Sequence, residues 1–314
     1  MTFTNPSEIP QTGMGRLYRR LSAPAATVWV LLAGALLCLP CLLSGLSLDD
    51  YFFKTVMLRP GALPGLPRPP FDVFAFIRGD VQQIRQAMEL GLLPWWTYFQ
   101  EYQFAFWRPL SSLTHWIDFR LFPEQAWLMH AHNIAWYVLL GAVLARLYRR
   151  WLSPPWVAVL AALLYMVDDA HGPPVAFISN RNALVAAALG FYSLLAHDGW
   201  RRSHRPLQAG LAWAAYALAL LSGESAIAVC GYLLAYALCL DTGRLRERLL
   251  SLAPYAAITL GWRALYSWLG YRAGGAGLYI DPLGEPLRFL GEFVQRLPVL
   301  LMGQLALPNS ALWV

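Results

Sequence analysis

Apolar stretches long enough to cross a membrane recur along most of the chain, and short polar segments separate them. A crossing needs about 20 apolar residues. Each crossing is expected to be an α-helix, because lipid cannot satisfy free backbone N–H and C=O groups. The pattern predicts seven crossings, near Ala25–Leu48, His130–Leu147, Trp151–Val167, Asn182–Leu195, Leu207–Leu221, Ser225–Leu240 and Leu249–Leu269. We therefore predict an all-α polytopic membrane protein.

Arginines gather in four clusters at the polar boundaries of these stretches. The clusters are Arg16/Arg19/Arg20, Arg146/Arg149/Arg150, Arg201/Arg202/Arg205 and Arg244/Arg246/Arg248. Between successive clusters the chain has room for two crossings. Because cytoplasmic loops collect Lys and Arg, this spacing places the N-terminus and all four clusters in the cytoplasm.

The long polar segment 49–126 is predicted to be an extracytoplasmic loop with helices of its own. Apolar residues at helical spacing predict an interfacial amphipathic helix here; they are Val73, Ile77, Val81, Ile84 and Met88. A second helix is expected to begin at Pro109, since proline is favoured at the first helical position. Its apolar side carries Leu110, Leu113, Ile117 and Leu121, and another stripe carries Ser111, His115 and Asp118.

The segment 286–314 at the other end of the chain is apolar but interrupted. Glu292, Arg296 and Pro298 fall within it, which predicts an interfacial helix or an incomplete crossing. The chain as a whole, 1–314, is predicted to be one transmembrane module. We expect the sequence to be a truncated piece of a longer protein.

Composition agrees with a membrane protein. At 58% hydrophobic and 13% charged residues, the chain is not expected to be an ordinary soluble globular domain. The net charge of +6 comes from the arginine clusters and Lys54 is the one lysine, so the charge indicates contact with the lipid bilayer rather than with nucleic acid. Four cysteines lie within apolar stretches and are expected to be free thiols: Cys38, Cys41, Cys230 and Cys239.

A pair of carboxylates, Asp49 and Asp50, stands where the first crossing leaves the outer leaflet. A carboxylate beside lipid is costly unless it is hydrated, paired or used, so the pair is a candidate functional site. Two hydrated residues marking the end of the helix would account for the position equally well.

Six short motifs occur in order along the chain. They are Asp49–Asp50–Tyr51; Arg108, Pro109, Leu110, Leu113 and Asp118; His130 and Asn133; Val175, Ala176, Phe177, Ile178, Ser179 and Arg181; Ser222 and Glu224; and Arg263. Together they resemble the polytopic glycosyltransferases of the GT-C class, most of all the protein O-mannosyltransferase-like branch, whose members often carry tetratricopeptide tails. The resemblance implies about seven transmembrane helices with a long first extracytoplasmic loop.

The chain departs from this family in two places. The family's His-Pro-x-His-x-Glu run corresponds here to Asp168–Asp169–Ala170–His171–Gly172–Pro173, and the lysine of the Ser-Lys-Glu motif is Gly223. Asp168 and Asp169 could stand in for the missing groups. With His171 they could also hold a divalent metal, Mn²⁺ or Mg²⁺, although a hydrated loop accounts for them as well.

The family chemistry implies transfer of a sugar from a polyprenyl-phosphate donor to an acceptor hydroxyl of a protein or glycan on the extracytoplasmic face. Asp49 would be the general base, with Asp50 supporting it, and direct displacement would invert the anomeric carbon. A cation must meet the leaving phosphate. The candidates, in order, are Arg181, Arg263 and Arg108, with Asp118, His130, His171 and Glu224 in support.

Alternative roles are open for these residues and for the chain. Arg181 could snorkel to the headgroups, Arg108 could pair with Glu101, and Arg263 with Glu224. A non-catalytic or decayed membrane subunit is one alternative function. A transporter is another, although its polar groups would be expected near the bilayer midplane. The compact loops favour the bacterial inner membrane as the location.

Overall fold

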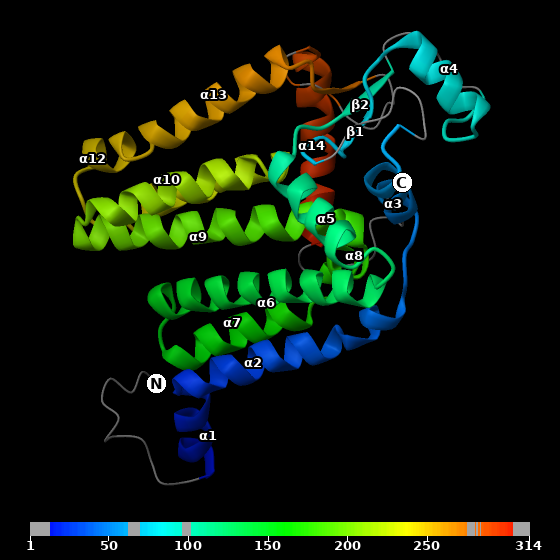
Figure 1. Ribbon diagram of the computed structural model, residues 1–314. Helices are drawn as coiled ribbons and strands as arrows, with labels where there is room; N and C mark the ends of the chain where they lie inside the picture. The colour runs from blue at the N-terminus through cyan, green and yellow to red at the C-terminus, as the bar shows by residue number, and fades with distance from the viewer. Residues whose placement is uncertain are drawn as a thin grey trace. The chain divides into compact units, whose positions relative to one another are not determined.

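The computed structural model describes residues 13–61, 70–95, 102–274, 280, 282 and 284–303. The chain is mostly helical and divides into two compact units (Figure 1). Unit 1 comprises residues 1–63, 67–74 and 107–265, and unit 2 comprises 64–66, 75–106 and 266–314.

Helices lie at every position where a crossing is predicted. They are α2 (Pro24–Leu37) with the 3₁₀ helix η2 (Leu39–Leu43), α6 (Ala126–Trp151), α7 (Pro155–Val167), α9 (Arg181–Ser203), α10 (Pro206–Leu220), η5 (Glu224–Ala228) with α11 (Val229–Cys239), and α12 (Leu245–Leu250) with α13 (Ala253–Trp268). Two of these segments, Pro24–Leu43 and Ala126–Trp151, are long and apolar enough to cross a membrane by length and composition. The helical character of the segments is confirmed; seven crossings are not shown.

The bundle of unit 1 is built around α9, which packs against α6 and α10 (Figure 1). On the other side of α6, α2 and α7 pack together. The helices approach closely at two glycines, which have no side chain to keep them apart. A Cβ atom on Gly34 of α2 or on Gly141 of α6 would overlap the side chain of Met166 on α7.

Short elements complete unit 1. They are α1 (Gly13–Ser22), α3 (Asp49–Leu58), α5 (Pro109–Leu121), η3 (Asp169–His171), α8 (Gly172–Ala176) and η4 (Ile178–Asn180). The helix predicted from Pro109 is confirmed, with proline in its first turn. The chain enters α3 through Leu48, whose φ of 44° is unusual for a residue other than glycine.

Unit 2 contains a small antiparallel sheet that the sequence pattern did not predict. Its order is β1 (Ala75–Ile77), β2 (Gln103–Ala105) and β3 (Arg272–Gly274). The helices α4 (Val81–Glu89) and α14 (Pro286–Gly303) belong to the same unit. Residues 304–314 of the predicted C-terminal segment lie outside the described part of the chain.

The helix expected over Val73–Met88 is wrong in its first half, because only α4 is helical. Gly79 has a φ of 88°, which interrupts any helix, and Asp80 then caps the start of α4 by accepting a hydrogen bond from the Gln82 N–H. The short strand β1 takes the residues before this turn. Apolar spacing alone does not detect such a break.

Candidate functional site

The helix α5 is amphipathic with its polar face turned inward. The side chains of Ser111, His115 and Asp118 are buried, whereas Ile117 is 39% exposed and Leu121 is 69% exposed. The predicted polar stripe is therefore real, but it faces the protein rather than water.

The centre of the site is Arg181, at the N-terminal end of α9. Its side chain is completely buried and forms an ion pair with Asp118. The guanidinium also donates to Asn133 Oδ1 over 2.6 Å, to the Met129 carbonyl over 3.1 Å and to the Thr114 carbonyl over 3.3 Å. Each of its three nitrogens is thus engaged by protein groups from α5 and α6.

Asp118 also contacts His132, for which the sequence predicted no role. The Asp118 Oδ1 atom lies 2.8 Å from His132 Nδ1, and the Trp136 indole N–H donates to His132 Nε2 over 3.0 Å. A ring nitrogen that accepts a hydrogen bond carries no proton, so His132 is the neutral tautomer that donates from Nδ1 to Asp118. The spacing of His132 and Trp136, one helical turn apart, was the available signal for this contact.

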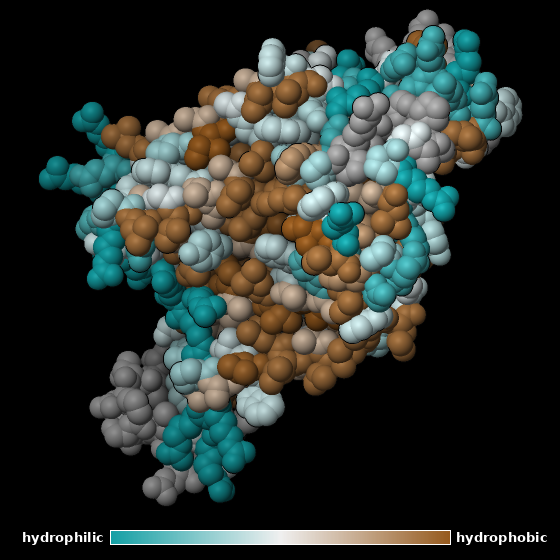
Figure 2. Space-filling view, in the orientation of Figure 1, coloured by the Kyte–Doolittle hydropathy of each residue, from teal (hydrophilic) through white to brown (hydrophobic). Residues whose placement is uncertain are grey.

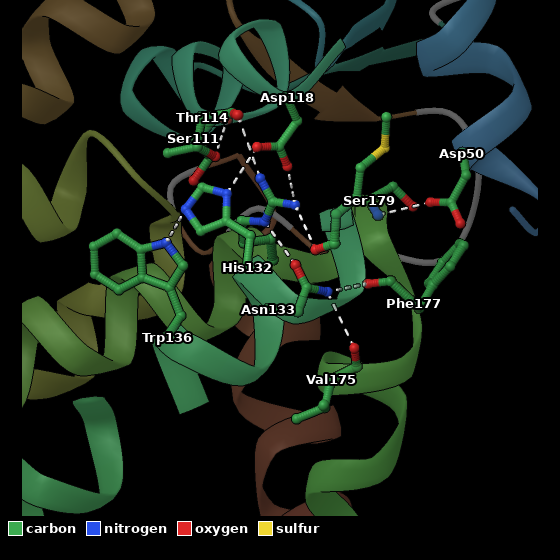
Figure 3. Close-up of polar contacts among 12 residues, drawn as sticks. Asp50, Ser111, Thr114, Asp118, His132, Asn133, Trp136, Val175, Phe177 and Ser179 are labelled. Atoms are coloured by element: carbon green, nitrogen blue, oxygen red, sulfur yellow. Dashed lines mark hydrogen bonds and ion pairs between the residues drawn. The ribbon is translucent and has the colours of Figure 1, made fainter. Parts of the chain in front are cut away.

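Two further side chains fasten the segment that precedes α9. Asn133 donates to the carbonyls of Val175 and Phe177, over 3.1 and 3.3 Å. The buried carboxylate of Asp50 accepts from the Ser179 backbone N–H over 2.7 Å and from the Ser47 N–H over 3.0 Å. We call Asp50, Asp118, His132, Asn133, Ser179 and Arg181 the Arg181 network (Figure 3). The Asp50–Ser179 pair is joined to the other four residues through the backbone between Val175 and Arg181, which Asn133 also binds.

Asp49 and Asp50 therefore differ in their surroundings, although they are adjacent. Asp50 is fully buried and committed to backbone N–H groups, whereas Asp49 is exposed in the first turn of α3. Partial burial, and then the neighbouring Asp50 carboxylate, raise the pKa of Asp49. A carboxylate with a raised pKa is a stronger base, which is the property expected of a proton acceptor.

His130 contacts the segment that leads into α3. Its buried ring lies with Nε2 at 2.7 Å from the Gly45 carbonyl and 3.3 Å from the Ser44 hydroxyl. Because a carbonyl only accepts, Nε2 is the protonated nitrogen. His130 thus holds the turn between η2 and the acidic pair.

The start of α5 is tied to the turn between α10 and η5. Arg108 forms an ion pair with Glu224, with Nε and Oε2 2.7 Å apart. Ser111 donates to the Ser222 carbonyl over 2.8 Å, and the Leu110 N–H donates to the Leu221 carbonyl over 3.0 Å. From the sequence, Glu224 was a possible partner of Arg263 and Glu101 of Arg108. In the structure Glu224 pairs with Arg108, and Glu101 lies outside the described residues.

Arg108 is linked to the helix of the acidic pair through aromatic rings. Its guanidinium lies 5.1 Å from the ring centroid of Phe74, a cation–π distance. Phe74 in turn contacts Phe53 of α3 edge to face, with centroids 5.1 Å apart. Lys54 follows Phe53 and forms an ion pair with Glu124 over 2.6 Å. In the sequence, Lys54 stood out only as the single lysine.

The remaining candidates lie on other elements. Arg263 is half-buried on α13. Asp168 caps the short helix η3 by accepting from the Ala170 N–H, Asp169 is exposed, and the His171 ring packs on Tyr165 with centroids 4.1 Å apart. Among the described residues, no group of three His, Cys, Asp or Glu side chains could hold a metal ion. A metal at Asp168, Asp169 and His171 gains no support from this geometry.

His115 is a buried side chain that sequence reasoning did not single out as a site residue. In the described part of the chain, neither of its ring nitrogens has a hydrogen-bond partner. Burial, and then the charge of Arg181, lower the pKa of His115 well below its usual value. The ring is therefore neutral, and it packs edge to face on Phe53 with centroids 5.0 Å apart.

Comparison of the chain with protein-family models, with curated proteins and with solved structures found no match in any of the three.

Proposed function

We propose that this chain is a multi-pass membrane glycosyltransferase that moves a sugar from a polyprenyl-phosphate donor to an acceptor hydroxyl on the extracytoplasmic face, with inversion. The observation that supports it best is the convergence of the motif residues. Asp50, Asp118, Asn133, Ser179 and Arg181 are scattered along the sequence, yet all belong to the Arg181 network. Within it, the bonds of Asp50 to the Ser179 and Ser47 N–H groups hold the residue next to Asp49.

In the proposed arrangement the seven helical segments cross the membrane with the N-terminus in the cytoplasm. Hydrophobic side chains cover the middle of the unit 1 bundle, and hydrophilic ones gather where α1 and α12 lie (Figure 2). Among the segments, α7 has 13 residues and is about 20 Å long, shorter than a hydrocarbon core of about 30 Å. The polar helix α9 is tolerated because neighbouring helices, rather than lipid, surround it.

Asp49 is the proposed general base. It is the exposed member of the acidic pair, so an acceptor hydroxyl can reach it, and its raised pKa strengthens it as a base. The base must be ionised to act, so transfer should fall as the pH drops through this raised pKa. Asp50 then has a positioning role, because its oxygens are already bound to N–H groups.

Arg108 is the proposed ligand of the donor phosphate. Arg181 is the first choice from sequence, but its side chain has no exposed surface and its nitrogens are engaged, so we assign it a positioning role. The Arg108 side chain is 17% exposed and its aromatic neighbours lead to α3. Glu224 would orient the guanidinium for the phosphate. Phosphate binding by Arg263 stays a prediction.

The test is transfer by the purified chain in lipid nanodiscs. A panel of synthetic polyprenyl-phosphate hexoses is supplied with peptide and glycan acceptors, and released polyprenyl phosphate is measured. Asp49→Asn should abolish release, while the exposed Glu89→Gln control keeps it. Arg108→Gln should weaken donor binding. Wild-type turnover by Asp49→Asn would refute the mechanism.

The same assay separates the alternatives. Donor binding without release by the wild-type chain would indicate a non-catalytic subunit. Movement of donor across sealed vesicles would indicate a transporter. A cysteine placed beside Asp49 should react only with reagents on the extracytoplasmic side, and labelling from the cytoplasm would refute the topology.

A further inference from the structure

An apolar groove lies between the α1–α2 junction and α7 in unit 1. Its volume is about 640 Å³, within the range of about 300–1,000 Å³ that is usual for small-molecule sites. The lining residues are Arg20, Leu21, Ala23, Ala25, Ala26, Trp29, Val30, Ala33, Val159 and Leu163. The groove shares no residue with the Arg181 network.

The hollow follows from the sequence at the start of α2. Four alanines face it, and their short side chains leave space that larger residues would fill. Trp29 lies among them and is 71% exposed, so it lines one side of the groove and does not close it. Val159 and Leu163 of α7 supply the opposite side. Such a lining matches a hydrocarbon chain, which needs apolar contact and no hydrogen bonds.

Positive charge is concentrated at one end of this groove. Arg20 contributes to the lining itself, and Arg16 and Arg19 are exposed on the same short helix, α1. Arg149 of α6 donates to the Ala23 carbonyl and to the Thr27 hydroxyl, each over 2.7 Å, which brings another guanidinium to the α1–α2 junction. One guanidinium group can donate two parallel hydrogen bonds to a phosphate, and clusters of arginines beside an apolar surface attract anionic lipids.

We propose that this groove binds one anionic phospholipid, with an acyl chain along Trp29, Val30 and Leu163 and the phosphate on Arg20. In the proposed topology, this end of α2 lies at the cytoplasmic leaflet, where anionic lipids supply such a headgroup. The inference needs membrane insertion but not glycosyl transfer. It would hold for a transporter or a non-catalytic subunit equally well.

Lipid retention by the purified chain tests the proposal. The protein is extracted in mild detergent, equilibrated with equal amounts of phosphatidylglycerol and phosphatidylcholine of matched acyl chains, and examined by native mass spectrometry. We expect one tightly held lipid, enriched in phosphatidylglycerol. Arg20→Gln should lower that enrichment about fivefold, corresponding to the loss of one basic residue near the surface. Arg146→Gln, an exposed arginine of the next cluster, is the matched control.

The acyl-chain part has its own pair of variants. Ala33→Trp fills the groove and should remove the retained lipid, whereas Leu32→Trp, at a neighbouring exposed position outside the lining, should keep it. A phosphatidylglycerol with a photoreactive acyl chain should label wild-type peptides of α2 and α7. Equal retention of both lipids, full retention by Ala33→Trp, or labelling confined to other helices would overturn the proposal. The wild-type labelling does not depend on how any variant folds.

Discussion

The two ends of α9 solve the same electrostatic problem in different ways. A helix dipole disfavours a cation at the N-terminus and an anion near the C-terminus, yet α9 begins at Arg181 and carries Asp198 close to its end. At the first end, the cation and its partner Asp118 are both buried. At the second, Asp198 is buried, but its partners Arg150 and Arg202 have side chains 41% and 57% exposed.

This difference separates a network that must stay complete from one that can exchange with water. Losing a partner inside the Arg181 network leaves a charge buried without compensation, which is strongly destabilising. Losing a partner at Asp198 leaves arginines that can turn their long side chains into solvent. The comparison predicts a steep and a shallow response to substitution at the two ends of one helix.

Removing the buried cation should have the largest effect. Arg181→Met strands Asp118 and the acceptor groups around it, so we expect a loss of about 3–5 kcal/mol in unfolding free energy. Denaturant unfolding of the purified chain in detergent measures it. Arg146→Met provides an exposed control. The double variant Arg181→Met/Asp118→Leu should recover part of the loss, and a double variant no better than the single one would contradict the idea of a stranded buried charge.

Removing the buried anion at the other end should cost less. Asp198 accepts hydrogen bonds from Arg150 and Arg202 over 2.8 Å and from the Trp151 indole over 3.2 Å. Asp198→Ala leaves the Trp151 indole N–H and the Tyr236 hydroxyl without this acceptor, while the arginines reach water, so we expect a loss of about 1–2 kcal/mol in unfolding free energy. The same unfolding measurement checks it. A loss equal to that of Arg181→Met would erase the distinction between the two ends.

The pH dependence of stability should reveal the contribution of Asp241, which pairs with Arg201 near the same end of α9. Burial raises the pKa of Asp241, but the hydrogen bonds from Arg201 and the Gly243 N–H outweigh that effect and lower it below the ordinary value of 3.8. The stabilisation is therefore present above this value and is lost as the pH falls through the lower pKa of the folded state. Unfolding measured between about pH 5 and 2 should show a smaller decline in Asp241→Asn than in the wild type. If the unfolding free energy declined equally in both proteins, the Asp241–Arg201 pair would not be a source of acid sensitivity.

The smallest effect is expected from the exposed partner. Arg202 pairs with Asp198 one helical turn away and is mostly in solvent, so Arg202→Ala should cost about 0.3–0.5 kcal/mol. High salt should reduce even this difference, because ions screen exposed pairs. A loss above about 1 kcal/mol, insensitive to salt, would show that this end is as closed as the other.

Sequence alone located the helices well and their partners poorly. Apolar length and the arginine boundaries placed all seven helical segments, and the proline rule placed the start of α5. Neither rule states what a polar side chain will meet. A cation at the N-terminus of α9 calls for an anion, which the sequence suggested would be a bound phosphate, but the fold supplies Asp118 from α5.

The other misses have the same origin. Strands of three residues carry too little periodicity to be read, so the sheet of unit 2 was not predicted. No role was predicted for His132, whose contacts are Trp136 on its own helix and Asp118 on another. Local spacing reveals the first contact, and only tertiary structure reveals the second.

The Met166 side chain lies against Gly34 and Gly141, so these three positions, which lie far apart in the chain, depend on one another. Because Gly34 and Gly141 lack side chains where the thioether lies, enlarging either one forces the Met166 side chain to move or calls for a smaller residue there. Homologous chains with a larger residue at 34 or 141 should therefore carry a smaller or differently placed side chain at 166. Met166 is buried, so oxidation of its thioether to a sulfoxide would place a polar oxygen in the packing between α2, α6 and α7 and should loosen it.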